Sequence, residues 1–337
     1  MKTLFLLISI AFCIYSEGQK TTACKIIKTF HIYSPGYWDY IAVNDKRLYV
    51  SHSTQVIVLN ETTGDSIGVI PNTNGVHGIA FDNKLGRGYT SNGRSNNVTV
   101  FDLKTNKTIT QIVTGADPDA ILYDPSSNNV ITCNGRGKSL SFIDPDSNKT
   151  VATIELSGTP EAAVADEAGK LYVNLEDKNQ VVGVDIKKHA VISTWSLAPG
   201  EGPTGLAIDK TANRLFVGCE QLLVVMDCLK GTVVYQTKIG KGCDGVVFDD
   251  EHKLIFTSNG EGSISVIKEN SRNKYKLLGK FPTKRGARTI AIDQEKQLIY
   301  LPTADFERVN QQNGRPKIVP GTFQVLVMNY SFRNSTK

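Results

Sequence analysis

The sequence predicts an all-β protein, a seven-bladed β-propeller in which seven copies of a four-stranded antiparallel unit close into one ring. Two observations predict this fold: a short apolar strand with an acidic or amide end recurs along the chain, and every copy continues with the same strands and turns. Asn44 lies 38 residues before Asp82, and the next steps are 42, 42, 43, 40 and 44 residues, a period typical of propellers. The recurring strands are Ile41–Asn44, Ile79–Asp82, Ile121–Asp124, Ala163–Asp166, Leu206–Asp209, Val246–Asp249 and Ile290–Asp293.

Three further strands follow each first strand. In the second copy, the second strand is Tyr89–Asn92, and the third, Val98–Asp102, alternates in steps of two. A polar turn then leads to a fourth strand, Thr108–Val113. The repeat has short strands, tight turns and no helical periodicity, so each copy is predicted to be an antiparallel meander.

The two ends of the repeat region predict how the ring closes. Lys25–Phe30 has the character of a fourth strand but precedes the first copy, whereas the last copy ends at its third strand, Val325–Asn329. We therefore expect the N-terminal strand to complete the last blade, because an open ring would leave unpaired strand edges. Residues 19–337 are predicted to form this single domain.

The first 18 residues are predicted to be a secretory signal peptide. Lys2 precedes an apolar run, and small residues at Ser16 and Gly18 favour cleavage before Gln19. We expect export to the periplasm or the extracellular space. A lipoprotein cleavage before Cys13 is the alternative, although it places Phe12 where a small residue is expected.

Charge and hydropathy argue against two classes of partner. The 337 residues carry a formal net charge of +5 and contain no run of five like charges, so a basic arm for nucleic acid is not expected. No apolar run is long enough for a transmembrane segment. We expect a monomer.

The strands also carry a family resemblance. Tyr172–Leu175 and Val98–Asp102 resemble the YVTN repeats of YncE-like seven-bladed propellers, and Gly115–Pro118 resembles the link between their blades. The resemblance covers residues 24 to 330 and repeats seven times. It implies the fold rather than the activity, because this fold hosts binding modules and several types of enzyme.

Polar residues fall at equivalent places in the repeat and predict a site. If the first strand of each blade is innermost, its start and the end of the second strand lie together at one end of the central channel. The starts carry Asp39, His77, Asp119, Glu161, Thr204, Asp244 and Arg288. The second strands end at His52, Asn92, Asn134, Leu175, Cys219, Asn259 and Thr303. The predicted ligand-binding residues are Asp39, His52, His77, Asn92, Asp119, Asn134, Glu161, Asp244, Asn259 and Arg288.

A divalent metal ion is the candidate cofactor of this site. Carboxylates such as Asp39 and Asp119 are oxygen ligands suited to Ca²⁺ or Mg²⁺. His52 and His77, on neighbouring blades, suit a softer ion such as Zn²⁺ when a carboxylate joins them. The alternative is that these residues are only the polar lining of a water-filled channel.

Cysteines and one insertion complete the predictions. Five cysteines follow the predicted signal peptide, and none of them forms a C-x-x-C motif. Cys219 and Cys243 are predicted to lie on the same face of adjacent blades, where they form either a disulfide or two separate thiols.

In the seventh copy, residues 304–322 form a long polar insertion over the same face. The insertion is either a lid over the mouth or a disordered connection between the second and third strands. Its charged residues are Asp305, Glu307, Arg308, Arg315 and Lys317.

No catalytic motif is present: the sequence lacks H-E-x-x-H, G-x-S-x-G, a P-loop and an EF-hand loop. We therefore expect an exported binding or scaffold protein that presents an acidic channel mouth to a small polar ligand, a metal ion or a partner protein. The alternative is a metal-dependent lyase or lactone hydrolase that acts at the mouth.

Overall fold

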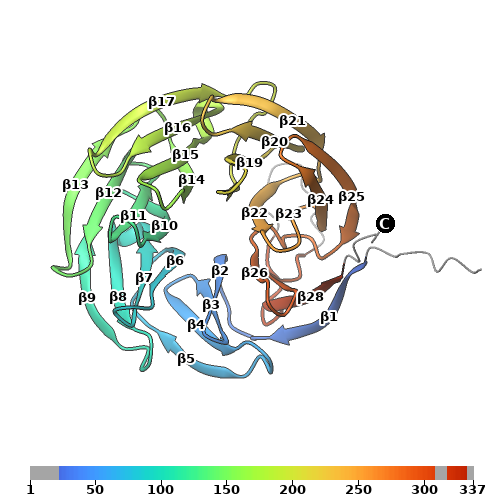
Figure 1. Cartoon of the computed structure of the whole chain (residues 1–337). Coiled ribbons are helices and arrows are strands. Elements are labelled where there is room, and N and C mark those ends of the chain that lie inside the picture. Colours follow the sequence, from blue (N-terminus) through green and yellow to red (C-terminus); the bar gives the residue numbers. More distant parts are fainter. Residues whose placement is uncertain (1–22, 308–316, 332–337) are drawn as a thin grey trace, which may run out of the picture.

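The computed structural model describes residues 23–307 and 317–331, which form seven blades in a ring around a central channel (Figure 1). This confirms the predicted all-β propeller. The predicted signal peptide and its cleavage site before Gln19 lie outside the described residues. Arg308 and Arg315 of the insertion lie outside them as well.

Each blade is a four-stranded antiparallel sheet. Blades 1 and 2 consist of β2 (Trp38–Asn44), β3 (Arg47–His52), β4 (Gln55–Asn60), β5 (Ser66–Ile70), and β6 (Val76–Asp82), β7 (Arg87–Asn92), β8 (Asn97–Asp102), β9 (Thr108–Val113). Blades 3 and 4 consist of β10 (Pro118–Asp124), β11 (Asn129–Asn134), β12 (Ser139–Asp144), β13 (Lys149–Glu155), and β14 (Pro160–Ala165), β15 (Lys170–Leu175), β16 (Gln180–Asp185), β17 (Ala190–Ser196). Blades 5 and 6 consist of β18 (Leu206–Asp209), β19 (Arg214–Cys219), β20 (Leu222–Asp227), β21 (Thr232–Lys238), and β22 (Cys243–Asp249), β23 (Leu254–Asn259), β24 (Ser263–Ser271), β25 (Lys274–Pro282). Blade 7 consists of β26 (Ala291–Asp293), β27 (Leu298–Thr303), β28 (Gln324–Ser331) and β1 (Ala23–His31).

Blade 7 closes the ring in the predicted way. Strand β1 pairs antiparallel with β28, from Ala23 opposite Ser331 to His31 opposite Gln324. The N-terminal strand thus supplies the outer strand that the last copy lacks. The described residues contain only two short 3₁₀ turns, η1 (Gly93–Ser95) and η2 (Glu176–Lys178). No helix among them is long and apolar enough to cross a membrane.

The first strand of each blade lines the channel and the fourth lies at the rim, as Figure 1 shows for β2 and β5. The middle strands are buried on both faces, because each blade packs between two neighbours. Val98 and Val100 of blade 2, for example, pack in one cluster with Val130 and Ile143 of blade 3. Rim strands such as β13 alternate between exposed and half-buried residues, as expected for edge strands.

Tyrosines at one position of the second strand link neighbouring blades. Tyr300 of blade 7 donates a hydrogen bond of 2.8 Å to the buried Glu61 of blade 1, which also pairs with Lys296. Tyr172 of blade 4 donates one of 3.1 Å to the Cys228 carbonyl of blade 5. Both bonds run from a second-strand tyrosine to the neighbouring blade, but only the bond to Glu61 has a carboxylate as acceptor.

We expect Tyr300→Phe to lower the free energy of unfolding by about 2 kcal/mol, because it removes a hydrogen bond to a charged group and leaves a Glu61 oxygen unsatisfied. Tyr172→Phe is the matched control and should cost about 1 kcal/mol, the usual net contribution of a neutral hydrogen bond. Urea unfolding measures both values. Equal losses in the two variants would contradict the special role of the Glu61 contact.

Candidate functional site

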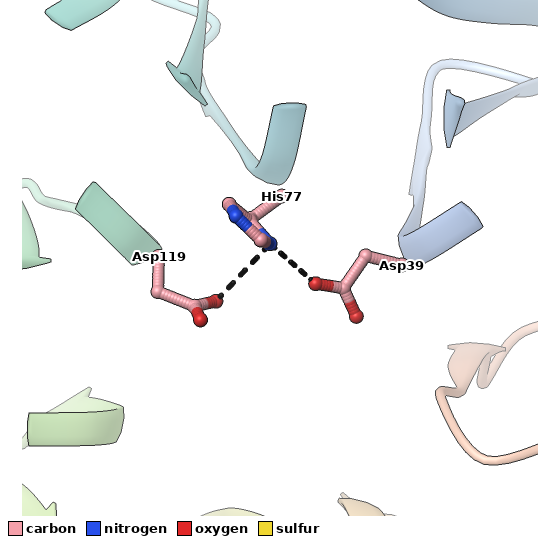
Figure 2. Close-up of side chains that lie close together, drawn as sticks. All are labelled: Asp39, His77 and Asp119. Carbon is pink, nitrogen blue, oxygen red and sulfur yellow. Dashed lines mark hydrogen bonds and ion pairs between the residues drawn. The ribbon is translucent and has the colours of Figure 1, made fainter. Parts of the chain in front are cut away.

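Three predicted site residues from three blades meet at the channel mouth. Asp39 on β2, His77 on β6 and Asp119 on β10 point toward one another in the open centre of the ring (Figure 2). The His77 Nδ1 atom lies 2.6 Å from an Asp39 oxygen and 3.8 Å from an Asp119 oxygen. One ligand atom from each residue fits within a 4.8 Å span. This donor set, one imidazole and two carboxylates, fits a divalent metal ion.

A repeated backbone irregularity positions these side chains. The pairing between the first and second strands shifts register between Trp38 and Ile41 in blade 1, and between Val76 and Ile79 in blade 2. Blades 3, 4 and 6 shift at the equivalent place. Such a bulge bends the strand and re-aims a side chain. The site residue falls inside the shift each time, which explains why equivalent positions of the repeat converge on one mouth.

The opposite side of the mouth is neutralised by an arginine. Arg288 lies 3.3 Å from an Asp39 oxygen and makes a closer ion pair with Asp244. Glu161 makes no ion pair with any described residue. Among the described residues, the mouth therefore holds four carboxylates (Asp39, Asp119, Glu161 and Asp244) but only two cationic groups, His77 and Arg288.

The pKa values reflect this imbalance. Burial and the charges of Asp119 and Asp244 raise the pKa of Glu161 to about 9. Burial also raises the pKa of Asp119, against the favourable charge of His77. For His77, burial lowers the pKa, but the hydrogen bond to Asp39 and the nearby carboxylates outweigh it and raise the pKa to about 9. The mouth is thus an environment that favours added positive charge.

A cavity of about 150 Å³ lies in the channel next to the mouth. Apart from Asp244, its lining residues follow the mouth residues by one or two positions along the chain, as Ala120 follows Asp119 and Ala162 follows Glu161. Tyr40, which follows Asp39, also lines it. Burial raises the pKa of Tyr40 well above its usual value, and its hydroxyl has no hydrogen-bond partner among the described residues.

Sequence reasoning missed Tyr40, although the repeat contains the signal. The position after the mouth residue is small in the other six copies and large only in the first. The other six residues are Gly78, Ala120, Ala162, Gly205, Gly245 and Thr289.

His52 lies apart from the cluster at the mouth. Its side chain is buried, with its ring 4.4 Å from that of Phe323, and burial lowers its pKa to about 4. Its Nε2 atom has no hydrogen-bond partner among the described residues.

The three predicted asparagines are wholly buried within their own blades. The Asn92 carbonyl accepts a hydrogen bond from Thr90, and its amide donates to Asn97 and Thr99. Asn134 and Asn259 repeat this pattern with a threonine two residues earlier and serines of the third strand. These contacts use the asparagines to join the second and third strands of a blade.

The possible disulfide between Cys219 and Cys243 does not form. Both are free, buried thiols. A Cβ atom at Gly218 would lie 2.6 Å from the Cys243 sulfur, so residue 218 faces Cys243. Successive residues of a strand point to opposite faces, so Cys219 points away and packs against Gly200 instead.

The described part of the insertion packs on blades 1 and 7. Phe306 forms an isolated bridge with Ile318, and its ring lies 6.1 Å from Trp38. Asp305 pairs with Lys284 at 2.5 Å. Glu307 and Lys317 are joined through a backbone hydrogen bond of 2.8 Å. The lid function of the insertion stays a prediction.

Comparison with known proteins identifies the fold alone. The sequence matches no family model. It matches no curated protein either. Among solved structures, a chain of the Kuenenia stuttgartiensis hydrazine synthase has a TM-score of 0.70 at 14% identity, covering 85% of this chain and 95% of its own. The WD40 repeats of RRP9 have a TM-score of 0.74 at 10% identity, covering 91% and 97%. These similarities support the propeller fold.

We expect Asp39→Asn to lower the pKa of His77 from about 9 toward its usual 6.5, because the variant removes the carboxylate that bonds the imidazole. An NMR titration of the imidazole signals measures the change. Asp117→Asn is the control, because Asp117 acts on His77 through charge alone and should lower the pKa less.

The same variant gives a stability signature. A pKa raised on folding contributes stability below the unfolded value of 6.5, and this contribution is lost as the pH rises through 9. The stability difference between wild type and Asp39→Asn should therefore be largest in acid and shrink toward about pH 10. A difference that is constant with pH would contradict the His77–Asp39 coupling.

Proposed function

We propose that the chain is an exported, monomeric binding protein of YncE-like type that takes a small, positively charged ligand at its channel mouth. The observation that carries the proposal is the charge imbalance at this mouth. Four carboxylates converge there, and in the part of the chain that the structure describes only His77 and Arg288 oppose them. A buried carboxylate without a counter-ion is costly, and a bound cation removes that cost.

The position of Arg288 indicates where the cation binds. Arg288 pairs with Asp39 and Asp244, and His77 also pairs with Asp39, so these two carboxylates already have cationic partners. Asp119 shares His77 with Asp39, and one buried Asp119 oxygen has no hydrogen-bond partner among the described residues. Glu161, on the next blade, has no described ion-pair partner. The cation therefore binds between Asp119 and Glu161.

We expect cation binding to weaken about tenfold in Asp119→Asn, which is the effect of losing one charge-assisted hydrogen bond. Titration calorimetry with calcium chloride, zinc chloride and hexylammonium chloride provides the measurement. Asp146→Asn is the matched control, because Asp146 lies in an exposed turn of the same blade and should change nothing. Binding should also tighten from about pH 6 to 9, because the raised pKa values of Asp119 and Glu161 require deprotonation first. If none of the three cations binds, the proposal is wrong.

A second candidate function is a metal-dependent lyase or lactone hydrolase. The triad of Asp39, His77 and Asp119 favours it, because these residues would hold a divalent ion at the mouth. Such an ion would supply Lewis-acid chemistry there.

If the protein is this enzyme, we expect purified wild type to contain one metal ion per chain and to melt at a lower temperature after EDTA treatment. Elemental mass spectrometry and thermal melting measure the two properties. His77→Ala should lose the metal, whereas His31→Ala, an exposed histidine on β1, should keep it. Wild type without metal, and with an unchanged melting temperature, would remove this candidate.

A further inference from the structure

The layer of residues next to the mouth is unusually small. In six of the seven copies, the residue after the mouth residue is glycine, alanine or threonine. Glycine or alanine leaves little side chain beyond the inner strand, so the channel widens there into the cavity of about 150 Å³. Tyr40 is the one large residue at this level.

Polar and apolar side chains both line the cavity. Tyr40, Asp244 and Thr289 are polar, and the Thr289 hydroxyl already donates a hydrogen bond of 2.6 Å to the Asp39 carbonyl. Ile121, Leu206, Val246 and Ile290 contribute apolar side chains to the lining. A cavity of about this volume holds a group the size of benzene, so a tail of about six carbons fits.

Tyr40 adds a polar atom to this layer. Its side chain is half-buried and lines the cavity, and its hydroxyl makes no hydrogen bond with a described residue. The hydroxyl oxygen can therefore accept a hydrogen bond from a bound molecule. A ligand head group that spans from the carboxylates to Tyr40 would make this contact.

We propose that the ligand is a primary amine with an apolar tail of about six carbons, the volume that the neighbouring cavity accepts. The ammonium group donates to Asp119, Glu161 and the Tyr40 hydroxyl oxygen, and the tail occupies the cavity. An ammonium has three donors and no acceptor, which matches three acceptor groups. This inference rests on the proposed binding of a cation at the mouth and adds the chemical class of the ligand.

Chain length gives the first test. Titration calorimetry of the mature protein with alkylamines from methylamine to hexylamine should show about fourfold tighter binding per carbon, the equivalent of about 0.8 kcal/mol per buried methylene. Hexanol and hexanoate should bind at least about tenfold more weakly than hexylamine, because they lack the positive charge.

The outcomes separate the two proposals. If methylamine, calcium or zinc binds in an Asp119-dependent manner but affinity does not rise with chain length, the cation site stands and the amine inference is wrong. Equal affinities for hexanol and hexylamine also overturn the inference. If no cation binds at all, both proposals fail.

Two variants test the cavity and the hydroxyl. Ala162→Leu fills the cavity and should flatten the dependence on chain length, whereas Ala165→Leu, outside the cavity on the same strand, should keep it. Tyr40→Phe retains the ring and should weaken hexylamine binding about tenfold. Circular dichroism and melting confirm that each variant folds. If Ala162→Leu does not fold, Tyr40→Phe decides, and undiminished binding in that variant overturns the proposal.

Discussion

Ring closure is the constraint on which the rest of the structure depends. The pairing of β1 with β28 joins the two ends of the chain and leaves no blade incomplete. It also creates contacts that no local segment can make. Asp39 and Arg288, 249 residues apart, are hydrogen-bonded because closure brings blade 7 against blade 1. The mouth therefore exists only in the closed ring, and its charges are held by the packing of all seven blades.

Rigid packing also explains how the mouth can hold several acidic groups of like charge together. The carboxyl groups of Asp119 and Asp244 raise the pKa of Glu161, and groups that repel one another in this way would separate on a flexible chain. Here each sits at the start of an inner strand whose neighbours on both sides are packed blades. The free-energy cost of holding these acidic groups together in a buried place appears in the pKa values of Glu161 and Asp119, which burial raises. Perturbed titration of this kind in a concave site is typical of binding and catalytic sites.

The repeat predicted the fold and the position of the mouth, because both follow from one period and the order of the strands. It did not predict which mouth residues touch, since a register shift of one residue redirects each side chain. Strand alternation turned Cys219 away from Cys243. The buried role of Asn92 required knowledge of its partners on β8. These features depend on side-chain direction, which the spacing of the copies alone does not determine.

The backbone is nearly symmetric, but the mouth is not. Each blade contributes one residue to the axis, so the chemistry at the centre is set by how seven equivalent positions differ. Arg288 pairs with the carboxylates on the side formed by blades 6, 7 and 1, whereas Glu161, on the side of blades 3 and 4, has no ion-pair partner among the described residues. Tyr40 breaks the symmetry of the next layer in the same way. A ligand at the axis therefore meets one side whose carboxylates are paired with arginine, one side with an unpaired carboxyl group, and one hydroxyl, which is enough to orient it although the scaffold around it repeats.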